Sequence, residues 1–361
     1  MTTLRDIFTA LAPAYLERYP PLPTAHRQVI SAIPQCQSGS YGYSLSQCHT
    51  CGGQHRVNHS CGNRHCPPCQ HHKPQQWLEH HLDKQLPGPH FLRPFTVPET
   101  LRPFIRSPQR PASQAMFHAS ATALKRLATA ERFLGPDLPG FPGVLHPWGR
   151  QLQCHPHSHY IGPGGGLSKA RTTWRPSRAN FFVPGKALSP ISRALVKEEM
   201  SQAGLLEHLD PQVWPIPWNV HSQAHHHRSS AFTSLAPYVF QVAISHRRLV
   251  SLTDHTVTFT YPKVDRARLR TAHLDGMECL RRFLQHVLPE GFMKVRPFGF
   301  LHASCALSLA TIRRLIGQGH PGEDPPPPRT PPHVVRCPTY GAPLCVVMRV
   351  WTSPSALIDP G

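Results

Sequence analysis

Acidic residues are scarce in this chain: 19 Asp and Glu stand against 38 Lys and Arg, and the formal net charge is +19. Such an excess favours a polyanionic partner, most commonly a nucleic-acid backbone, although a basic pI without a role in DNA binding is the simpler alternative. Long apolar runs are also missing, since no stretch approaches the roughly 20 residues that a membrane span needs. The first residues lack the charged and apolar stretches of a signal peptide. We therefore expect a cytoplasmic protein without membrane association.

Cysteine is clustered, because six of the 11 cysteines fall between Cys36 and Cys69. This clustering indicates metal binding in a reducing compartment and not a disulfide framework. Two C-x-x-C pairs, separated by 14 residues, predict one closed four-thiolate zinc site that stabilises the fold. The expected ligands are Cys48, Cys51, Cys66 and Cys69. Further candidates are Cys61, His65 and Cys36, so that an exchanged ligand or a second site stays open.

Three histidines alternate along the segment that follows Cys154. Side chains two residues apart in a strand point to the same face, so His157 and His159 could bind one divalent ion side by side. His155 shares that face. Imidazole suits Zn, Cu, Fe and Ni, and it can help to hold a catalytic Mg or Mn. The alternative is that these histidines line a solvated strand face without any metal.

The order of the expected elements indicates an α+β fold. Strands are expected over residues 91–97, 143–152 and 155–161, and a helix over 113–134 lies between the first two. This order is compatible with an antiparallel sheet that is flanked by helices.

Tyr238 opens a largely apolar run that ends at Ile244. A tyrosine on a helix that faces a metal-bound phosphate could attack it and form a covalent phosphotyrosine. By itself, Tyr238 is interpreted more simply as a core aromatic residue.

Together these motifs resemble the transposases of the insertion sequence ninety-one family and the related common-region elements. These are rolling-circle HUH transposases, in which two histidines flank one residue. The resemblance covers roughly residues 6–315. It rests on the segments Ser60–Gln70, Leu86–Phe91, Val144–Gly149, His155–His159, Pro163–Ser168, Tyr238–Val239, Val242–Ser245 and Gly299–Leu301.

The resemblance implies an N-terminal zinc-binding module followed by an HUH-type catalytic domain with an antiparallel sheet flanked by helices. His157 and His159 would hold Mg or Mn at the scissile phosphate of single-stranded DNA, at the transposon ends and the target. Tyr238 would attack that phosphate and leave a 5′-phosphotyrosine link. A third metal ligand is usual in such sites, and the candidates are His146, on the preceding strand, and Gln241. The oligomeric state stays open.

Three residues depart from the family pattern. Ser158 stands between the histidines where an apolar residue is usual, and we expect it on the other face of the sheet, where it affects packing. Ser234 stands where many relatives carry a first tyrosine. Pro237 immediately precedes Tyr238 and disturbs a helix unless it lies in the first turn. A catalytically decayed, zinc-dependent DNA-binding protein is therefore the alternative function, and a metal-dependent nuclease that uses water is a third.

We expect three segments. Residues 1–85 would form a helical N-terminus and the zinc-binding module, residues 86–315 the catalytic domain, and residues 316–361 a proline-rich, irregular tail. Within this tail, Cys337 begins the outline of a zinc knuckle whose second cysteine is missing.

Overall fold

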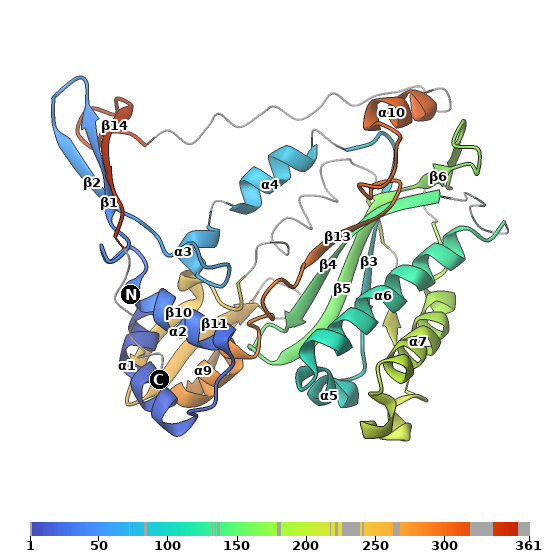
Figure 1. Ribbon diagram of the computed structural model, residues 1–361, viewed down its shortest axis with the longest axis horizontal. Helices are drawn as coiled ribbons and strands as arrows, with labels where there is room; N and C mark the ends of the chain where they lie inside the picture. Colours follow the sequence, from blue (N-terminus) through green and yellow to red (C-terminus); the bar gives the residue numbers. More distant parts are fainter. Residues whose placement is uncertain are drawn as a thin grey trace.

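The computed structural model describes most of the 361 residues (Figure 1). The described residues are 2–71, 73–82, 85–131, 133, 135, 138–178, 182–216, 218–220, 223–225, 239, 242–262, 268–317 and 335–352. They form helices and antiparallel sheets, which confirms the expected α+β class. No helix within these ranges is both long and apolar enough to cross a lipid bilayer.

The central sheet has the strand order β7-β6-β4-β5-β3-β8, to which β13 adds by pairing with β4 and β9 by pairing with β3. Its strands are β3 (His90–Thr96), β4 (Leu138–Trp148), β5 (Cys154–Pro163), β6 (Gly165–Leu167), β7 (Trp174–Pro176), β8 (Asn219–Val220), β9 (Gln223–His225) and β13 (Val295–Gly299). Strands form at all three predicted positions and are neighbours in one antiparallel sheet. The bounds of the second prediction, 143–152, are wrong, because β4 begins at Leu138 and ends at Trp148.

Helices cover one face of this sheet (Figure 1). They are α5 (Arg102–Arg106), α6 (Gln109–Ala128) and α7 (Gly185–Gln202). Leu145 and Tyr160, from neighbouring strands, point into the core beneath α6. On the opposite face, Val144 and Ile161 form a small apolar cluster with residues of α4 (Lys73–Leu82). The period-two alternation of strand side chains thus separates a helix-covered face from the face that carries the alternating histidines.

A second unit combines both halves of the chain. It contains α1 (Leu4–Arg18), α2 (Thr24–Gln35), β10 (Leu249–Thr253), β11 (Thr256–Pro262), β12 (Leu269–Asp275) and α9 (Gly276–Leu284). A capping box between Thr3 and Asp6 satisfies backbone N–H groups at the start of α1. Phe8 of α1 meets Phe283 of α9 edge to face, with ring centroids 5.3 Å apart. This shared core crosses the domain boundary that we expected at residue 85.

Local sequence explains the hairpin and the helix of this unit. Asp254 and His255 adopt positive φ angles of 47° and 61°, as the tight turn between β10 and β11 requires. Helix α9 begins at Gly276, because Asp275 caps it by accepting hydrogen bonds from the backbone N–H groups of Met277 and Glu278.

The zinc-binding region consists of β1 (Tyr43–Cys48), β2 (Gln54–Asn58) and the short helix α3 (Pro67–Gln70). Strand β14 (Leu344–Val350) pairs antiparallel with β1 and completes a small sheet (Figure 1). The tail that we expected to be irregular therefore contains a strand that returns to the N-terminal module. The remaining elements are α10 (Leu309–Gly317) and the 3-10 turns η1 (Glu99–Leu101), η2 (Leu206–His208), η3 (Pro211–Val213) and η4 (His246–Arg248).

Candidate metal centres

Strands β4 and β5 bring three of the predicted site residues together. His146 lies directly opposite His157, and Val144 lies opposite His159. The ring nitrogens of His146, His157 and His159 that could bind a metal all lie within 4.8 Å of one another. Their ring centroids form a triangle with sides of 5.2, 5.3 and 4.9 Å. The spacing of the pair, together with the antiparallel neighbour, thus produces a three-imidazole group.

Burial keeps two of these histidines, His157 and His159, neutral. Removal from water lowers the pKa of His157 to about 4 and that of His159 to about 3. His146 is also buried, with 1% of its surface exposed. A neutral imidazole is the form that binds metals, so no proton has to leave these two rings at neutral pH.

The orientation of His157 is set by its own strand. Its Nδ1 lies 2.6 Å from the carbonyl oxygen of His155, which can only accept, so Nδ1–H donates. Nε2 therefore carries the lone pair that can face a metal. The ring of His155 lies 5.0 Å from that of His157 but is outside the three-imidazole group. The shared strand face thus does not make His155 a ligand.

Cationic groups lie beside the three histidines. The charges of Lys294 and Arg102 both act to lower the pKa of His157. The ammonium of Lys294 stands 4.7 Å from the ring centroid of Trp148, which stacks on His146. Burial lowers the pKa of Lys294 itself to about 7. A positive field of this kind suits a phosphate group.

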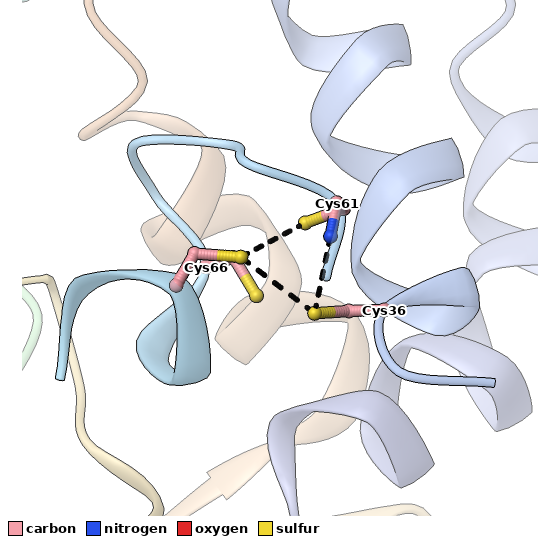
Figure 2. A group of neighbouring side chains, drawn as sticks. Cys36, Cys61 and Cys66 are labelled. Carbon is pink, nitrogen blue, oxygen red and sulfur yellow. Dashed lines mark hydrogen bonds between the residues drawn. The ribbon is translucent and has the colours of Figure 1, made fainter. Parts of the chain in front are cut away.

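The cysteines do not assemble as predicted. Cys66 and Cys69 lie with Cys36 and Cys61, whose sulfur atoms are all within 4.8 Å of one another. Figure 2 shows Cys36, at the end of α2, and Cys61 and Cys66, on the loop that leads into α3, pointing toward one another. Cys48 and Cys51 instead lie with Cys337. The predicted grouping of the two C-x-x-C pairs around one ion is therefore corrected, because the pairing of β1 with β2 and β14 holds the first pair away from the second.

Sulfur distances in the four-cysteine cluster match a metal site. Cys36 and Cys69 are 3.7 Å apart, and Cys61 and Cys69 are 3.5 Å apart. A zinc ion at about 2.3 Å from each sulfur in a tetrahedron separates its ligands by about 3.8 Å, whereas a disulfide needs about 2.05 Å. Cys36 and Cys61, which we had named as extra candidates, complete the donor set. The cluster therefore fits a closed zinc site.

His65, the other extra candidate, lies outside both cysteine groups. Burial lowers the pKa of its ring to about 3. Its neighbour Arg64 donates to the backbone carbonyls of Leu288 and Phe292. The segment between the cysteines thus anchors the zinc module to the segment that follows α9, in which Leu288 and Phe292 belong to the core beneath α6.

Comparisons with known proteins agree with this arrangement. A family model described as "Transposase zinc-binding domain" matches residues 7–97, and one described as "Putative transposase" matches residues 140–308. A curated protein of Sinorhizobium fredii, "Putative transposase y4qJ", is 34% identical over 340 residues, which cover 88% of this chain and 84% of that protein. The chain belongs to the transposase family of the insertion sequence ninety-one type.

A second relative of this transposase is the "Transposase for insertion sequence element IS801" of Pseudomonas savastanoi pv. phaseolicola. It is 25% identical over 351 residues, with 89% of this chain and 82% of the relative covered. No solved structure matches the chain. The zinc-binding model and the four-cysteine cluster together support a structural zinc ion in this transposase.

The remaining predicted site residues, Tyr238 and Gln241, lie outside the described residues, as do Ser234 and Pro237. Val239, the next residue after Tyr238, is described. It is buried against Val144 and Ile161, on the face of the sheet that carries the histidines. Val239 therefore lies over the same sheet face as the candidate metal ligands.

Proposed function

We propose that this transposase cleaves and rejoins single-stranded DNA through a covalent 5′-phosphotyrosine intermediate. The observation that carries the proposal is the group of His146, His157 and His159, which forms on one sheet face. Its donor set of pre-positioned imidazoles fits a divalent cation. The three side chains would hold Mg or Mn, which when bound polarises the scissile phosphate.

Tyr238 is the proposed nucleophile. Its phenolic oxygen forms a bond to the phosphorus, the bond to the 3′ oxygen breaks, and that oxygen takes up a proton to become a free 3′-hydroxyl. The reverse attack by a 3′-hydroxyl restores the phosphodiester and releases the tyrosine. The position of Val239 on the histidine face supports this role, because Val239 directly follows Tyr238 in the sequence.

Substrate binding would rest on the cationic groups around the histidines and on the zinc module. The charges of Lys294 and Arg102 lower the pKa of His157, and such cationic groups would attract the phosphate groups of a strand that enters the site. The net charge of +19 for the whole chain also favours binding to a polyanion such as DNA. The zinc ion would stabilise the module that holds the ends of the element.

The test is incubation of the full chain with end-labelled single-stranded DNA and Mn, followed by a denaturing gel. Tyr238→Phe is compared with Tyr261→Phe, a matched control on β11. We expect a protein–DNA adduct in the wild type and in Tyr261→Phe, and none in Tyr238→Phe. Cleavage without an adduct that persists in Tyr238→Phe would instead identify a hydrolytic nuclease. Binding without cleavage in any of the three proteins would identify a catalytically decayed DNA-binding protein.

A further inference from the structure

Two turns at opposite ends of the chain have the same backbone hydrogen bonds. In the turn Cys48–Gly53, the N–H of Gly52 donates to the carbonyl of Cys48 at 2.8 Å, and the N–H of Cys48 donates to Gly53 at 3.0 Å. In the turn Cys337–Ala342, the N–H of Gly341 donates to the carbonyl of Cys337 at 2.8 Å, and the N–H of Cys337 donates to Ala342 at 2.8 Å. The second turn therefore repeats the first.

The glycines of the two turns also correspond. Gly52 has a φ angle of 69° and Gly341 one of 66°, in the left-handed region that glycine adopts without strain. Each glycine lies four residues after the cysteine that begins its turn, Cys48 or Cys337. The residues that immediately precede the glycines, Cys51 and Tyr340, therefore occupy equivalent positions. The missing cysteine of the C-terminal knuckle is thus replaced by Tyr340, which is 61% exposed.

Three sulfur atoms meet between these turns. Those of Cys48, Cys51 and Cys337 all lie within 4.8 Å of one another. Cys51 and Cys337 are 3.9 Å apart, close to the roughly 3.8 Å that separates ligands around a tetrahedral zinc ion and far beyond a disulfide. Cys48 and Cys337 are buried, with 0% and 1% of their surfaces exposed. Their burial directs the thiol groups inward and not toward solvent.

The small sheet around these turns has little else to stabilise it. Strand β14 is mostly exposed, including Val346, Val347 and Met348. Within the described part of the chain, none of the hydrophobic core clusters includes a residue of β1, β2 or β14. Small modules without a core of their own usually depend on a metal or a disulfide.

We propose that Cys48, Cys51 and Cys337 bind a second zinc ion and so close a zinc ribbon made from both ends of the chain. Each thiol loses a proton on binding, and the metal joins the C-terminal strand β14 to the N-terminal module. Tyr340 leaves the fourth coordination position to a water molecule. His49 and Cys345 do not fill it, because they contact each other at 3.0 Å outside the group.

The first test removes a proposed ligand and measures the zinc content of the full chain after purification with Zn²⁺. Cys337→Ser should lose about one zinc ion per chain relative to the wild type. Cys345→Ser is the control, because Cys345 is an exposed cysteine on β14 that lies outside the group. It should retain the wild-type content. An unchanged zinc content in Cys337→Ser would overturn the proposal.

A gain-of-ligand variant tests the site without removing a buried group. Tyr340→Cys supplies the fourth thiolate, and Tyr340→Ser removes the same phenol without adding a ligand. We expect Tyr340→Cys to retain one zinc ion at chelator concentrations at least tenfold above those that strip the same ion from Tyr340→Ser. Equal retention in both variants would contradict the proposal. If Cys337→Ser loses more than one zinc ion, the comparison of Tyr340→Cys with Tyr340→Ser decides whether the second site exists.

Hydrogen exchange connects the metal to the strand. Chelation should expose the amides of β14 to exchange in the wild type, whereas those of the central strand β5 stay protected. Protection of β14 that does not change on chelation would show that the metal does not hold this strand, and would overturn that part of the proposal. None of these readouts depends on DNA cleavage, so they are independent of the proposed catalytic mechanism.

Discussion

The hydroxyl oxygens of Ser120 on α6 and Ser158 on β5 lie 3.3 Å apart in the fully buried interface between helix and sheet. Ser120 also lies 2.7 Å from the hydroxyl of Tyr160 and donates to the carbonyl of Met116. The expectation that Ser158 faces away from the histidines is therefore confirmed. The polar residue between the two histidines has a hydrogen-bond partner, so this departure from the family pattern leaves the histidine face intact.

Substitutions of Ser158 should separate hydrogen bonding from packing. Ser158→Ala leaves Ser120 with its other partners, so it should cost less than about 1 kcal/mol of unfolding free energy. Ser158→Val places a larger side chain in the same closed space and should cost about 1–3 kcal/mol. Chemical denaturation measures both. A Val variant as stable as the wild type would show that the interface is looser than the burial indicates.

The three-imidazole group should be required for catalysis but not for binding. Replacing His146, His157 or His159 by Ala should each lower Mn-dependent cleavage by at least about 100-fold, because metal-ion stabilisation contributes several kcal/mol. Binding of labelled single-stranded DNA in the absence of metal should stay within about threefold of wild type, since no phosphate contact is removed.

His155→Ala is the matched control for these variants. It removes an imidazole from the same strand face but keeps the backbone carbonyl to which His157 donates. Its cleavage rate should remain near that of the wild type. A loss as large as that in His157→Ala would show that the metal group is not the one that the structure brings together.

Folding stability should depend on pH through His286. This ring is fully buried and its Nε2 lies 3.0 Å from the carbonyl of Leu152. Burial lowers its pKa from 6.5 to about 4. Between these values the unfolded chain binds a proton that the folded chain does not. The contribution is therefore complete above pH 6.5 and declines as the pH falls toward 4, by at most about 1.4 kcal/mol per pH unit.

The comparison of His286→Gln with the wild type isolates this contribution, because other buried histidines titrate in both proteins. Melting temperatures from pH 7 to pH 5 should fall less steeply in His286→Gln. Parallel curves for the two proteins would mean that His286 binds its proton equally well in the folded and unfolded states.

The four-cysteine cluster should stabilise the second unit. Cys36 and Cys66 are buried in the same core as Phe8 and Leu280. Loss of the metal should therefore loosen the cysteine cluster and this core together. We expect Cys69→Ser to lose one zinc ion and more than about 3 kcal/mol of unfolding free energy. Cys345→Ser, an exposed control, should change neither. Thermal unfolding together with metal analysis checks this, and wild-type stability in Cys69→Ser would refute a structural zinc at this cluster.

Strand alternation was enough to predict that His157 and His159 share a face. His146 was proposed only through the family resemblance, with Gln241 as the other candidate, and it is the antiparallel register of β4 and β5 that brings His146 to the pair. The fold class followed in the same way from strands and helices whose apolar periodicity is clear. Ser158 was assigned to the opposite face by the same alternation.

The zinc ligands could not be predicted in this way. A C-x-x-C spacing shows that Cys48 and Cys51 can share a metal, but it does not say which distant residues complete the set. That depends on the pairing of β1 with β14, which lie at opposite ends of the chain. The sequence did contain a signal, the outline of a zinc knuckle at Cys337. Only the pairing of β1 with β14 brings that outline to the first C-x-x-C pair, Cys48 and Cys51.

The central claim, that Tyr238 becomes covalently linked to DNA at a site built by the three histidines, is tested most directly by peptide mapping. The full chain is reacted with a single-stranded oligonucleotide and Mn, digested with protease and nuclease, and examined by mass spectrometry. The account predicts one peptide that carries a residual nucleotide on Tyr238, and its absence when His157 is replaced by Ala. A nucleotide on another residue, or DNA cleavage with no modified peptide, would contradict it.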